Sequence, residues 1–326
     1  MRYLITGGAG FIGSQFVRQT LASGGAEVVV LDNLSAGSRA NLADVASQIS
    51  LVVGDIAERA VYEQLGTGFD AIVHFAAETH VDRSITGPSA FVVSNVLGTG
   101  ELLEYARRTA VPRLLMVSTD EVYGTIDEGS WTEDFPLAPR SPYSASKASA
   151  DLLSLSYVST FGMDISITRC TNNYGPYQLP EKLIPHFVSE LKAGRTVPVY
   201  GDGSNIRDWL HVDDHCRGIR LALDKGKAGR VYNIGGGTEL ANLELTRMLL
   251  AAMGLGEERI TYVTDRPGHD KRYSLDWSRA QRELGYEPQV SFESGLASTV
   301  QWYLDHPEWV AEARERAHAL AGQQAS

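Results

Sequence analysis

The stretch that decides the fold stands at the start of the chain and reads RYLITGGAGFIG (Arg2–Gly13). Its apolar first half predicts a buried strand, and the residues that follow predict a helix. Between them, Gly7, Gly10 and Gly13 recur at intervals of three. Glycines at such positions allow a tight turn, let the backbone approach a pyrophosphate, and let the helix pack closely on the strand. Because the first N–H groups of a helix have no partner within it, the stretch predicts a phosphate-binding loop.

Beyond this loop, the first half of the chain alternates apolar segments with helical patterns. The apolar segments are continuous, which is typical of strands buried on both faces. The expected strands cover residues 2–6, 27–32, 49–55, 71–77, 113–119 and 164–170, and the expected helices cover 11–23, 58–66, 89–109 and 143–161. This alternation predicts an α/β fold with a Rossmann-type doubly wound parallel sheet.

The second half of the chain is less regular and richer in turn-forming residues. Helical patterns return near 213–224, 241–253, 277–284 and 292–317. We therefore expect a smaller mixed α/β substrate-binding domain, with a cleft between it and the sheet. The predicted division assigns residues 1–172 and about 206–230 to a dinucleotide-binding domain, and residues 173–205 and 231–326 to the substrate domain.

Composition and charge narrow the classes of function. The chain has 326 residues, of which 43% are hydrophobic, and a formal net charge of −11. It contains no segment rich in Lys and Arg, which argues against nucleic acid as a partner. No apolar run reaches the roughly 20 residues that a spanning helix needs, which argues against a membrane protein. Its two cysteines, Cys170 and Cys216, form neither a disulfide framework nor a CxxC metal site, so we expect a cytoplasmic protein without metal.

Two strand ends carry acids that suit a dinucleotide. Asp32 ends the second expected strand, about 20 residues after the glycines. A carboxylate at this position accepts hydrogen bonds from the adenosine ribose and repels a 2′-phosphate, which favours NAD over NADP. Arg39, close by in sequence, weakens that preference. Asp55 ends the third strand, and the sequence supports an adenine contact and a cap of the next helix equally.

Two further motifs predict proton transfer. YSASK places Tyr143 and Lys147 on one face of a helix. The Lys ammonium favours the phenolate, so we expect a depressed pKa for Tyr143 and a base that deprotonates an alcohol while NAD⁺ accepts hydride. STDEVYG (Ser118–Gly124) places Asp120 and Glu121 directly after a strand. Two adjacent acids in a dry cleft cannot both ionise cheaply, so one should hold a proton, and the sequence does not say which.

These motifs together resemble a known enzyme family. TGGAGFIG (6–13), the strand-end Asp32, HFAAETHVDRS (74–84), STDEVYG and YSASK are similar to the extended short-chain dehydrogenases/reductases, and the acid pair is similar to their nucleotide-sugar 4,6-dehydratases. Segments 169–185, 200–219 and 265–276 resemble the same enzymes, and the likeness covers residues 1 to about 300. It implies a hydro-lyase that uses NAD to dehydrate dTDP-glucose at the start of a deoxysugar pathway. It also implies a homodimer, with the helices near 89–109 and 143–161 paired across a twofold axis.

The resemblance implies a role for each catalytic residue. Thr119 would bond the sugar 4-oxygen beside Tyr143, the base for the 4-hydroxyl, with Lys147 next to it. Glu121 would remove the C5 proton, and Asp120 would protonate the leaving 6-hydroxyl.

The same resemblance implies two sets of contact residues. Those expected at NAD are Gly7, Gly10, Phe11, Ile12, Gly13, Asp32, Asn33, Leu34, Ser35, Asp55, Ile56, Ala76, Ala77, Ser94, Tyr143, Lys147 and Asn173. Those expected at the nucleotide-sugar are Thr79, Thr119, Asn172, Lys182, Leu183, Pro198, Tyr200, Arg207, Asn242, Arg266 and His269. The segment NLSAGSRANL after Asp32 departs from the family's longer LTYAGN pattern, which affects the adenosine contacts rather than the chemistry.

Other interpretations of the sequence are weaker. A UDP-sugar 4-epimerase or decarboxylase on the same scaffold would not need the acid Asp120 at C6. A GDP-mannose dehydratase usually lacks this Asp and favours NADP. A non-catalytic NAD-binding protein would not need the four reactive side chains of Asp120, Glu121, Tyr143 and Lys147. His80 is expected to be structural, and HVDDHCRG (211–218) is expected to start a helix rather than bind metal.

Overall fold

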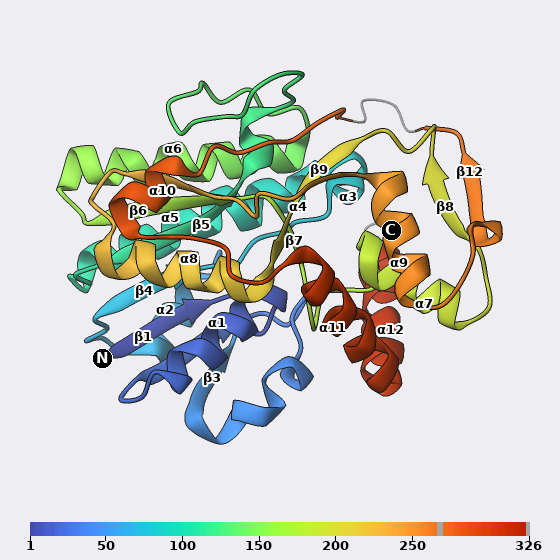
Figure 1. Cartoon of the computed structure of the whole chain (residues 1–326). Coiled ribbons are helices and arrows are strands. Elements are labelled where there is room, and N and C mark those ends of the chain that lie inside the picture. Colours follow the sequence, from blue (N-terminus) through green and yellow to red (C-terminus); the bar gives the residue numbers. More distant parts are fainter. Residues whose placement is uncertain (266–269, 324–326) are drawn as a thin grey trace.

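The main body of the protein is a seven-stranded parallel sheet (Figure 1). The computed structural model describes residues 1–265 and 270–323, with side chains up to residue 317. The strands, in spatial order, are β10 (Val231–Ile234), β6 (Ile165–Cys170), β5 (Leu114–Thr119), β4 (Ala71–His74), β1 (Arg2–Thr6), β2 (Glu27–Asp32) and β3 (Ile49–Val53). The chain order reverses between β1 and β4, so the carboxyl ends of these strands frame a crevice suited to a ligand.

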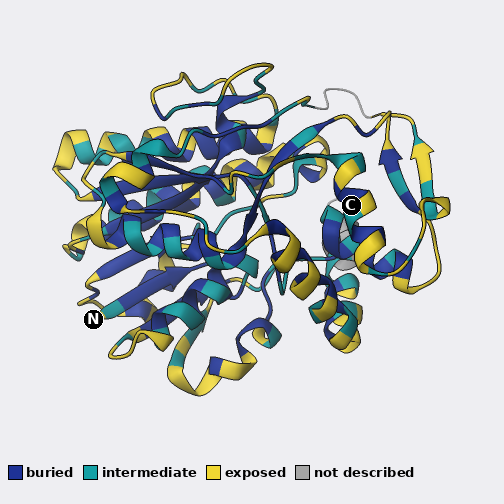
Figure 2. Cartoon of the chain, in the orientation of Figure 1, coloured by how far each residue is buried: buried dark blue, intermediate teal, exposed yellow. Residues whose placement is uncertain are grey.

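Helices cover both faces of this sheet, and its strands are largely buried except for the edge strand β3 (Figure 2). One apolar core joins the sheet to α1 (Phe11–Ala22), α8 (Val212–Lys225) and α10 (Ser278–Leu284). A second core joins the opposite face to α2 (Arg59–Leu65), α5 (Thr99–Arg108) and α6 (Pro142–Phe161). The expected Rossmann-type doubly wound sheet is confirmed.

A smaller part packs beside the carboxyl edge of the sheet (Figure 1). It contains a mixed three-stranded sheet of β11 (Glu239–Ala241), β9 (Ile206–His211) and β7 (Asn172–Tyr174), and a pair formed by β12 (Ile260–Val263) and β8 (Val197–Tyr200). A third apolar core unites these strands with four helices. They are α7 (Leu183–Lys192), α9 (Asn242–Ala252), α11 (Phe292–Asp305) and α12 (Pro307–Gln323). This part matches the expected smaller mixed α/β unit. The predicted domain boundaries stay a prediction. Strand β10 joins the large sheet, although residues 231–326 were assigned to the substrate domain.

The predicted elements in the first half agree with the structure to within a few residues. The expected helix over 89–109 consists of α4 (Pro88–Phe91), the π-helical segment η2 (Val92–Gly98) and α5. The single helix expected over 292–317 is wrong, because the chain breaks at His306 into α11 and α12. Pro307 lacks an N–H and disfavours helical backbone at the residue before it, so the first helix ends there. Helix α7 was not expected.

None of the helices within the described ranges is long and apolar enough to cross a membrane. The part that positions the site lies where β5 ends at Thr119 and the chain continues into a 3₁₀ turn, η3 (Asp120–Tyr123). Two short elements of the first half are helix α3 (Val81–Thr86), which follows β4 in the chain, and the 3₁₀ segment η1 (Arg39–Gln48), which follows β2.

Candidate active site

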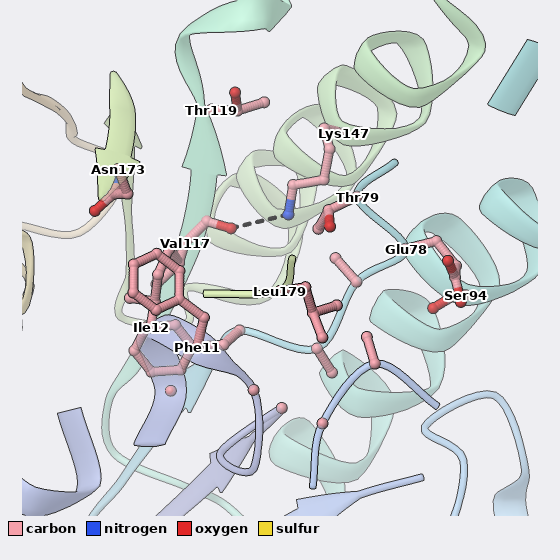
Figure 3. A pocket seen from close by; sticks show the side chains of 18 of the residues that line it. Phe11, Ile12, Glu78, Thr79, Ser94, Val117, Thr119, Lys147, Asn173 and Leu179 are labelled. Atoms are coloured by element: carbon pink, nitrogen blue, oxygen red, sulfur yellow. Dashed lines mark hydrogen bonds between the residues drawn. The ribbon is translucent and has the colours of Figure 1, made fainter. Parts of the chain in front are cut away.

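A cavity of about 310 Å³ follows the carboxyl ends of the central strands (Figure 3). It extends from the glycine loop and Asp32, past Ala76 and Thr79, to Thr119 and the side chains of α6. Residues that follow β7 in the smaller part, such as Leu179 and Lys182, close its other wall. The cavity therefore joins the two ends that the sequence assigned to adenosine and to proton transfer.

The glycine loop has the close approach that a pyrophosphate needs. Gly7 has a φ of +70°, and a Cβ added there would lie 2.5 Å from the Ala76 nitrogen. A Cβ on Gly13 would lie 2.2 Å from the Gly7 carbonyl oxygen. Helix α1 begins after Gly10, which offers no side chain to cap it. The first N–H groups of α1 are thus presented beside a cradle that any larger side chain would fill, and the residues fit NAD.

Asp32 is held by the backbone on both sides. Its Oδ2 accepts a hydrogen bond from the Ala9 N–H (2.9 Å), and its Oδ1 accepts one from the Leu34 N–H (2.8 Å). Burial raises the pKa of Asp32, and these two backbone bonds oppose that rise. Asp55 accepts hydrogen bonds from the Ala57 N–H and the Asn33 amide, and it does not line the cavity. The Asp55 side chain thus connects the loop that follows β2 with the loop that follows β3.

Most of the residues expected at NAD line the cavity. They are Gly7, Gly10, Phe11, Ile12, Gly13, Asp32, Asn33, Ser35, Ile56, Ala76, Ala77, Ser94, Tyr143, Lys147 and Asn173. Leu34 and Asp55 do not line it. Leu34 contributes its backbone to the bond with Asp32 instead, at a φ of +58°.

Tyr143 and Lys147 project from the first turns of α6 into the cavity. The helix starts in a capping box formed by Ser141 and Ser144. The Lys147 ammonium donates to the carbonyl of Val117 (2.9 Å), as Figure 3 shows, and burial lowers its pKa. Burial and the charge of Glu121 raise the pKa of Tyr143 well above its usual value. The expectation of a depressed pKa is wrong for the polypeptide alone, because burial and the charge of Glu121 raise the pKa of Tyr143 while the Lys147 ammonium bonds the Val117 carbonyl.

The acid pair is set by the turn that follows β5. Thr119 donates from its hydroxyl to Asp120 Oδ1 (3.3 Å) and accepts from the Glu121 N–H (3.3 Å). Asp120 is 3% exposed, and its Oδ2 has no hydrogen-bond partner among the residues that the structure describes. Burial, then the charges of Glu121 and Asp208, raise the pKa of Asp120 well above its usual value. Burial therefore favours the protonated form of Asp120.

The residues expected at the nucleotide-sugar divide into two groups. Thr79, Thr119, Asn172 and Lys182 line the cavity. The others that the structure describes do not line it; they are Leu183, Pro198, Tyr200, Arg207 and Asn242. The remaining two, Arg266 and His269, lie outside the described residues.

Arg207 belongs to the group outside the cavity, yet it is buried. Its guanidinium donates to the carbonyls of Ile206 and Asp270, and it packs over the Tyr273 ring. Its positive charge opposes the rise in the pKa of Asp120. Arg207 thus acts electrostatically on Asp120, and its contact with the nucleotide-sugar stays a prediction.

Several lining residues were not expected from sequence. Glu78, Cys170, Gln178 and Glu181 are among them. Cys170 ends β6 of the central sheet, which is the positional signal that could have found it, and Glu78 lies in the loop that follows β4. Glu181 lies 3.3 Å from Arg83 and 3.7 Å from His80.

The histidines and acids that raised the question of a metal have structural contacts. His80 caps α3 by accepting from the Arg83 N–H, in keeping with its expected structural role. In the segment 211–218, His211 caps α8 and Asp214 pairs with Arg217. Over the described ranges, no group of three or more His, Cys, Asp or Glu side chains is arranged to hold a metal ion.

Comparison with known proteins agrees with this geometry. A family model described as GDP-mannose 4,6 dehydratase matches residues 4–299. A dTDP-glucose 4,6-dehydratase from an Actinoplanes species is 55% identical over 318 residues, which cover 95% of this chain and 99% of that protein.

Among solved structures, a dehydratase is more similar to this chain than an epimerase is. The crystal structure of DesIV, a dTDP-glucose 4,6-dehydratase from Streptomyces venezuelae with NAD and TYD bound, has a TM-score of 0.94 and 56% identity, covering 96% of this chain and 100% of that one. A UDP-glucose 4-epimerase from Thermotoga maritima is more distant, with a TM-score of 0.89, 31% identity, and coverage of 94% and 100%.

Proposed function

The chain belongs to the GDP-mannose 4,6 dehydratase family, and we propose that it dehydrates dTDP-glucose to dTDP-4-keto-6-deoxyglucose with NAD as its cofactor. The observation that carries this proposal is Asp120, a buried acid with a raised pKa that lines the same cavity as Tyr143 and Lys147. An oxidation alone would need only the latter two groups. An acid whose protonated form is favoured by burial supplies the proton donor that the loss of water also requires.

The first proton transfer falls to Tyr143. We assign it as the base that removes the proton from the sugar 4-hydroxyl, with the Thr119 hydroxyl as its hydrogen-bond partner. Bound NAD⁺ would accept the hydride from C4, return it to C6 at the end of the reaction, and supply a positive charge that favours the phenolate. Lys147 would hold a second positive charge near the site, fixed by its bond to Val117.

The elimination falls to the acid pair. A ketone at C4 acidifies the C5 proton, which we assign to Glu121 as the base. Asp120, whose pKa burial raises, would give a proton to the departing 6-hydroxyl, so that water leaves. Hydride return to C6 and reprotonation at C5 complete the product. The cofactor ends oxidised, so the net reaction is an elimination.

A 4-epimerase is the second candidate, since the Thermotoga maritima enzyme shares the fold. Epimerisation at C4 needs no acid at C6. Asp120 therefore distinguishes the two reactions, and the higher identity to dehydratases agrees with that distinction.

The proposed function is tested by incubating the purified protein with dTDP-, UDP-, CDP- and GDP-glucose. We expect a 4-keto-6-deoxy product from dTDP-glucose without net consumption of NAD. If the NAD-containing protein turns over neither dTDP- nor UDP-glucose, the proposal is wrong.

We further propose that the protein is a cytoplasmic homodimer paired through η2 and α6. These neighbouring helical segments carry exposed apolar side chains, among them Val93 and Leu97 on η2 and Leu152 on α6. Exposed apolar side chains gathered on one face are typical of interfaces. Light scattering should give twice the mass of the chain for the wild type and a monomer for Leu97→Glu, whereas Tyr262→Glu on the exposed strand β12 should stay dimeric. A monomeric wild type would exclude the dimer.

A further inference from the structure

A buried polar network lies directly behind the turn that carries Asp120 and Glu121. Its centre is Arg169 on β6, which pairs in register with Ser118 of β5 on one side and with Asn233 of β10 on the other. The Arg169 guanidinium donates to Asp151 Oδ2 (2.9 Å) and to the Tyr123 hydroxyl (2.7 Å). Arg169 is 3% exposed and Asp151 is 0% exposed, so this ion pair has lost its water.

Tyr123 is anchored from two directions. Its hydroxyl accepts from Arg169 and donates to Asn233 Oδ1 (2.9 Å). Asn233 is fixed in turn, since its N–H donates to Glu133 and its amide donates to the Trp131 carbonyl (both 2.9 Å). The Tyr123 ring stacks on Trp131 with a centroid distance of 5.5 Å. The position of Tyr123 is therefore determined by three separate strands or loops.

The network ends at both halves of the proposed catalytic apparatus. Tyr123 closes the 3₁₀ turn that begins with Asp120 and Glu121. Asp151 lies one helical turn beyond Lys147 on α6, and its charge opposes the burial that lowers the pKa of Lys147. Neither Tyr123, Arg169 nor Asp151 lines the cavity. A buried ion pair is weak evidence for stability, because desolvation offsets much of the attraction. Its location between the two reactive groups suggests a geometric role instead.

We propose that Asp151, Arg169 and Tyr123 form a positioning unit that holds the acid pair in register with Tyr143 and Lys147, so that water loss follows oxidation of the same bound sugar. This inference rests on the proposed function. It assigns no chemistry to the three residues, since they touch neither sugar nor cofactor. It predicts that loosening the unit slows the elimination more than the oxidation, because Tyr123 controls only the turn with the acids.

Tyr123→Phe tests the unit with a single missing oxygen. The ring and its stacking on Trp131 remain, while Arg169 and Asn233 each lose a partner. We expect kcat to fall about tenfold with KM unchanged, because a small displacement of an acid or base costs much rate. In single turnovers, the variant should accumulate more reduced nicotinamide than the wild type, and its absorbance measures this. The isotope effect with sugar deuterated at C5 should rise, because C5–H cleavage becomes more rate-limiting.

Tyr105→Phe is the matched control. Tyr105 is also buried, and its hydroxyl donates to the Gly66 carbonyl (2.6 Å), away from the cavity. Both variants should lower the unfolding temperature to a similar extent, but only Tyr123→Phe should change the absorbance transient and the isotope effect. Arg169→Lys, which keeps a charge for Asp151 and gives up the bond to Tyr123, should reproduce the Tyr123→Phe transient.

The inference is overturned if Tyr123→Phe has the kinetics of Tyr105→Phe, or if oxidation and elimination slow equally in it. Wild-type turnover of dTDP-glucose in the same assay tests the proposed function separately. An active wild type with an unaffected Tyr123→Phe would refute the positioning unit alone.

Discussion

The buried acids at the two ends of the cavity differ in the hydrogen bonds that their oxygens accept. At the adenosine end, both oxygens of Asp32 accept backbone hydrogen bonds, from Ala9 and from Leu34. At the catalytic end, Asp120 bonds only the Thr119 hydroxyl, and its second oxygen has no partner among the described residues. Burial raises the pKa of both acids, but only at Asp32 do backbone donors oppose it.

This difference separates binding from proton transfer. A carboxylate bonded by the backbone is held in one geometry and stays suited to recognising a ribose. A buried acid without such donors favours its neutral form, and an acid that reacts must be able to give up that proton. Among the described residues, one oxygen of Asp120 is thus left without a partner at the end where this acid has chemistry to perform. Three predictions test this contrast at the two ends of the cavity, and a fourth concerns a buried group outside the cavity.

The largest effect is expected from the acid pair. Asp120→Asn and Glu121→Gln should each slow formation of the 4-keto-6-deoxy product at least about tenfold, since each removes a proton-transfer group. Oxidation of the sugar should persist, and absorbance of the reduced nicotinamide would report it. A double variant with the activity of the wild type would refute the assigned roles.

At the adenosine end, Asp32→Asn should weaken NAD binding about tenfold. The new amide group would face one of the two backbone N–H donors and leave a buried donor unpaired. Asp276→Asn is the matched control, because Asp276 also accepts a backbone N–H, from Ser278, but does not line the cavity. Calorimetry with NAD should separate the two variants, and equal losses in both would show that Asp32 has no special role in binding.

A smaller effect on the same end is expected from helix α12. The Trp309 indole donates to Asn41 Oδ1 (2.8 Å), and the Asn41 amide donates to the Ala9 carbonyl (2.8 Å) next to the phosphate loop. Trp309→Phe should speed NAD dissociation about fivefold, the usual value of one hydrogen bond. Trp302→Phe, in the neighbouring helix α11, should leave the dissociation rate unchanged. Retention of NAD by both variants would mean that α12 does not support the loop.

The smallest effect on activity is expected from a buried titratable group away from the cavity. His215 is fully buried in α8, and burial lowers its pKa to about 3 from an ordinary value of 6.5. The unfolded chain binds the proton more readily, so stability is fully present above pH 6.5 and falls as the pH drops towards 3. At about pH 5 the loss from this residue is about 2 kcal/mol.

His215→Leu should therefore reduce the fall in unfolding free energy between neutral pH and about pH 5, while leaving kcat unchanged. Denaturant titrations at several pH values measure it. If the unfolding free energy of the variant falls as much as that of the wild type at acid pH, the effect belongs to other groups. One such group is His74, whose pKa burial also lowers to about 3.

The sequence predicted much of this site because its motifs are local. The glycines at 7, 10 and 13, the strand ends at Asp32 and Thr119, and the spacing of Tyr143 and Lys147 each depend on neighbours within one turn or strand. The parallel sheet then brings the strand ends to one edge. The division of helix 292–317 could also have been predicted, since Pro307 is visible in the sequence.

By itself, the sequence determined the sheet, the cofactor loop and the identity of the reactive side chains, because hydrophobic periodicity and backbone chemistry act over short distances. Only the tertiary structure decided that the pKa of Asp120 is raised, because that pKa depends on burial, on the charge of Glu121 and on Asp208 from another strand. It also decided that Lys147 bonds Val117 and that Arg169 connects β6, α6 and the turn of Tyr123. Desolvation and contacts between segments far apart in the chain are properties of the packed protein.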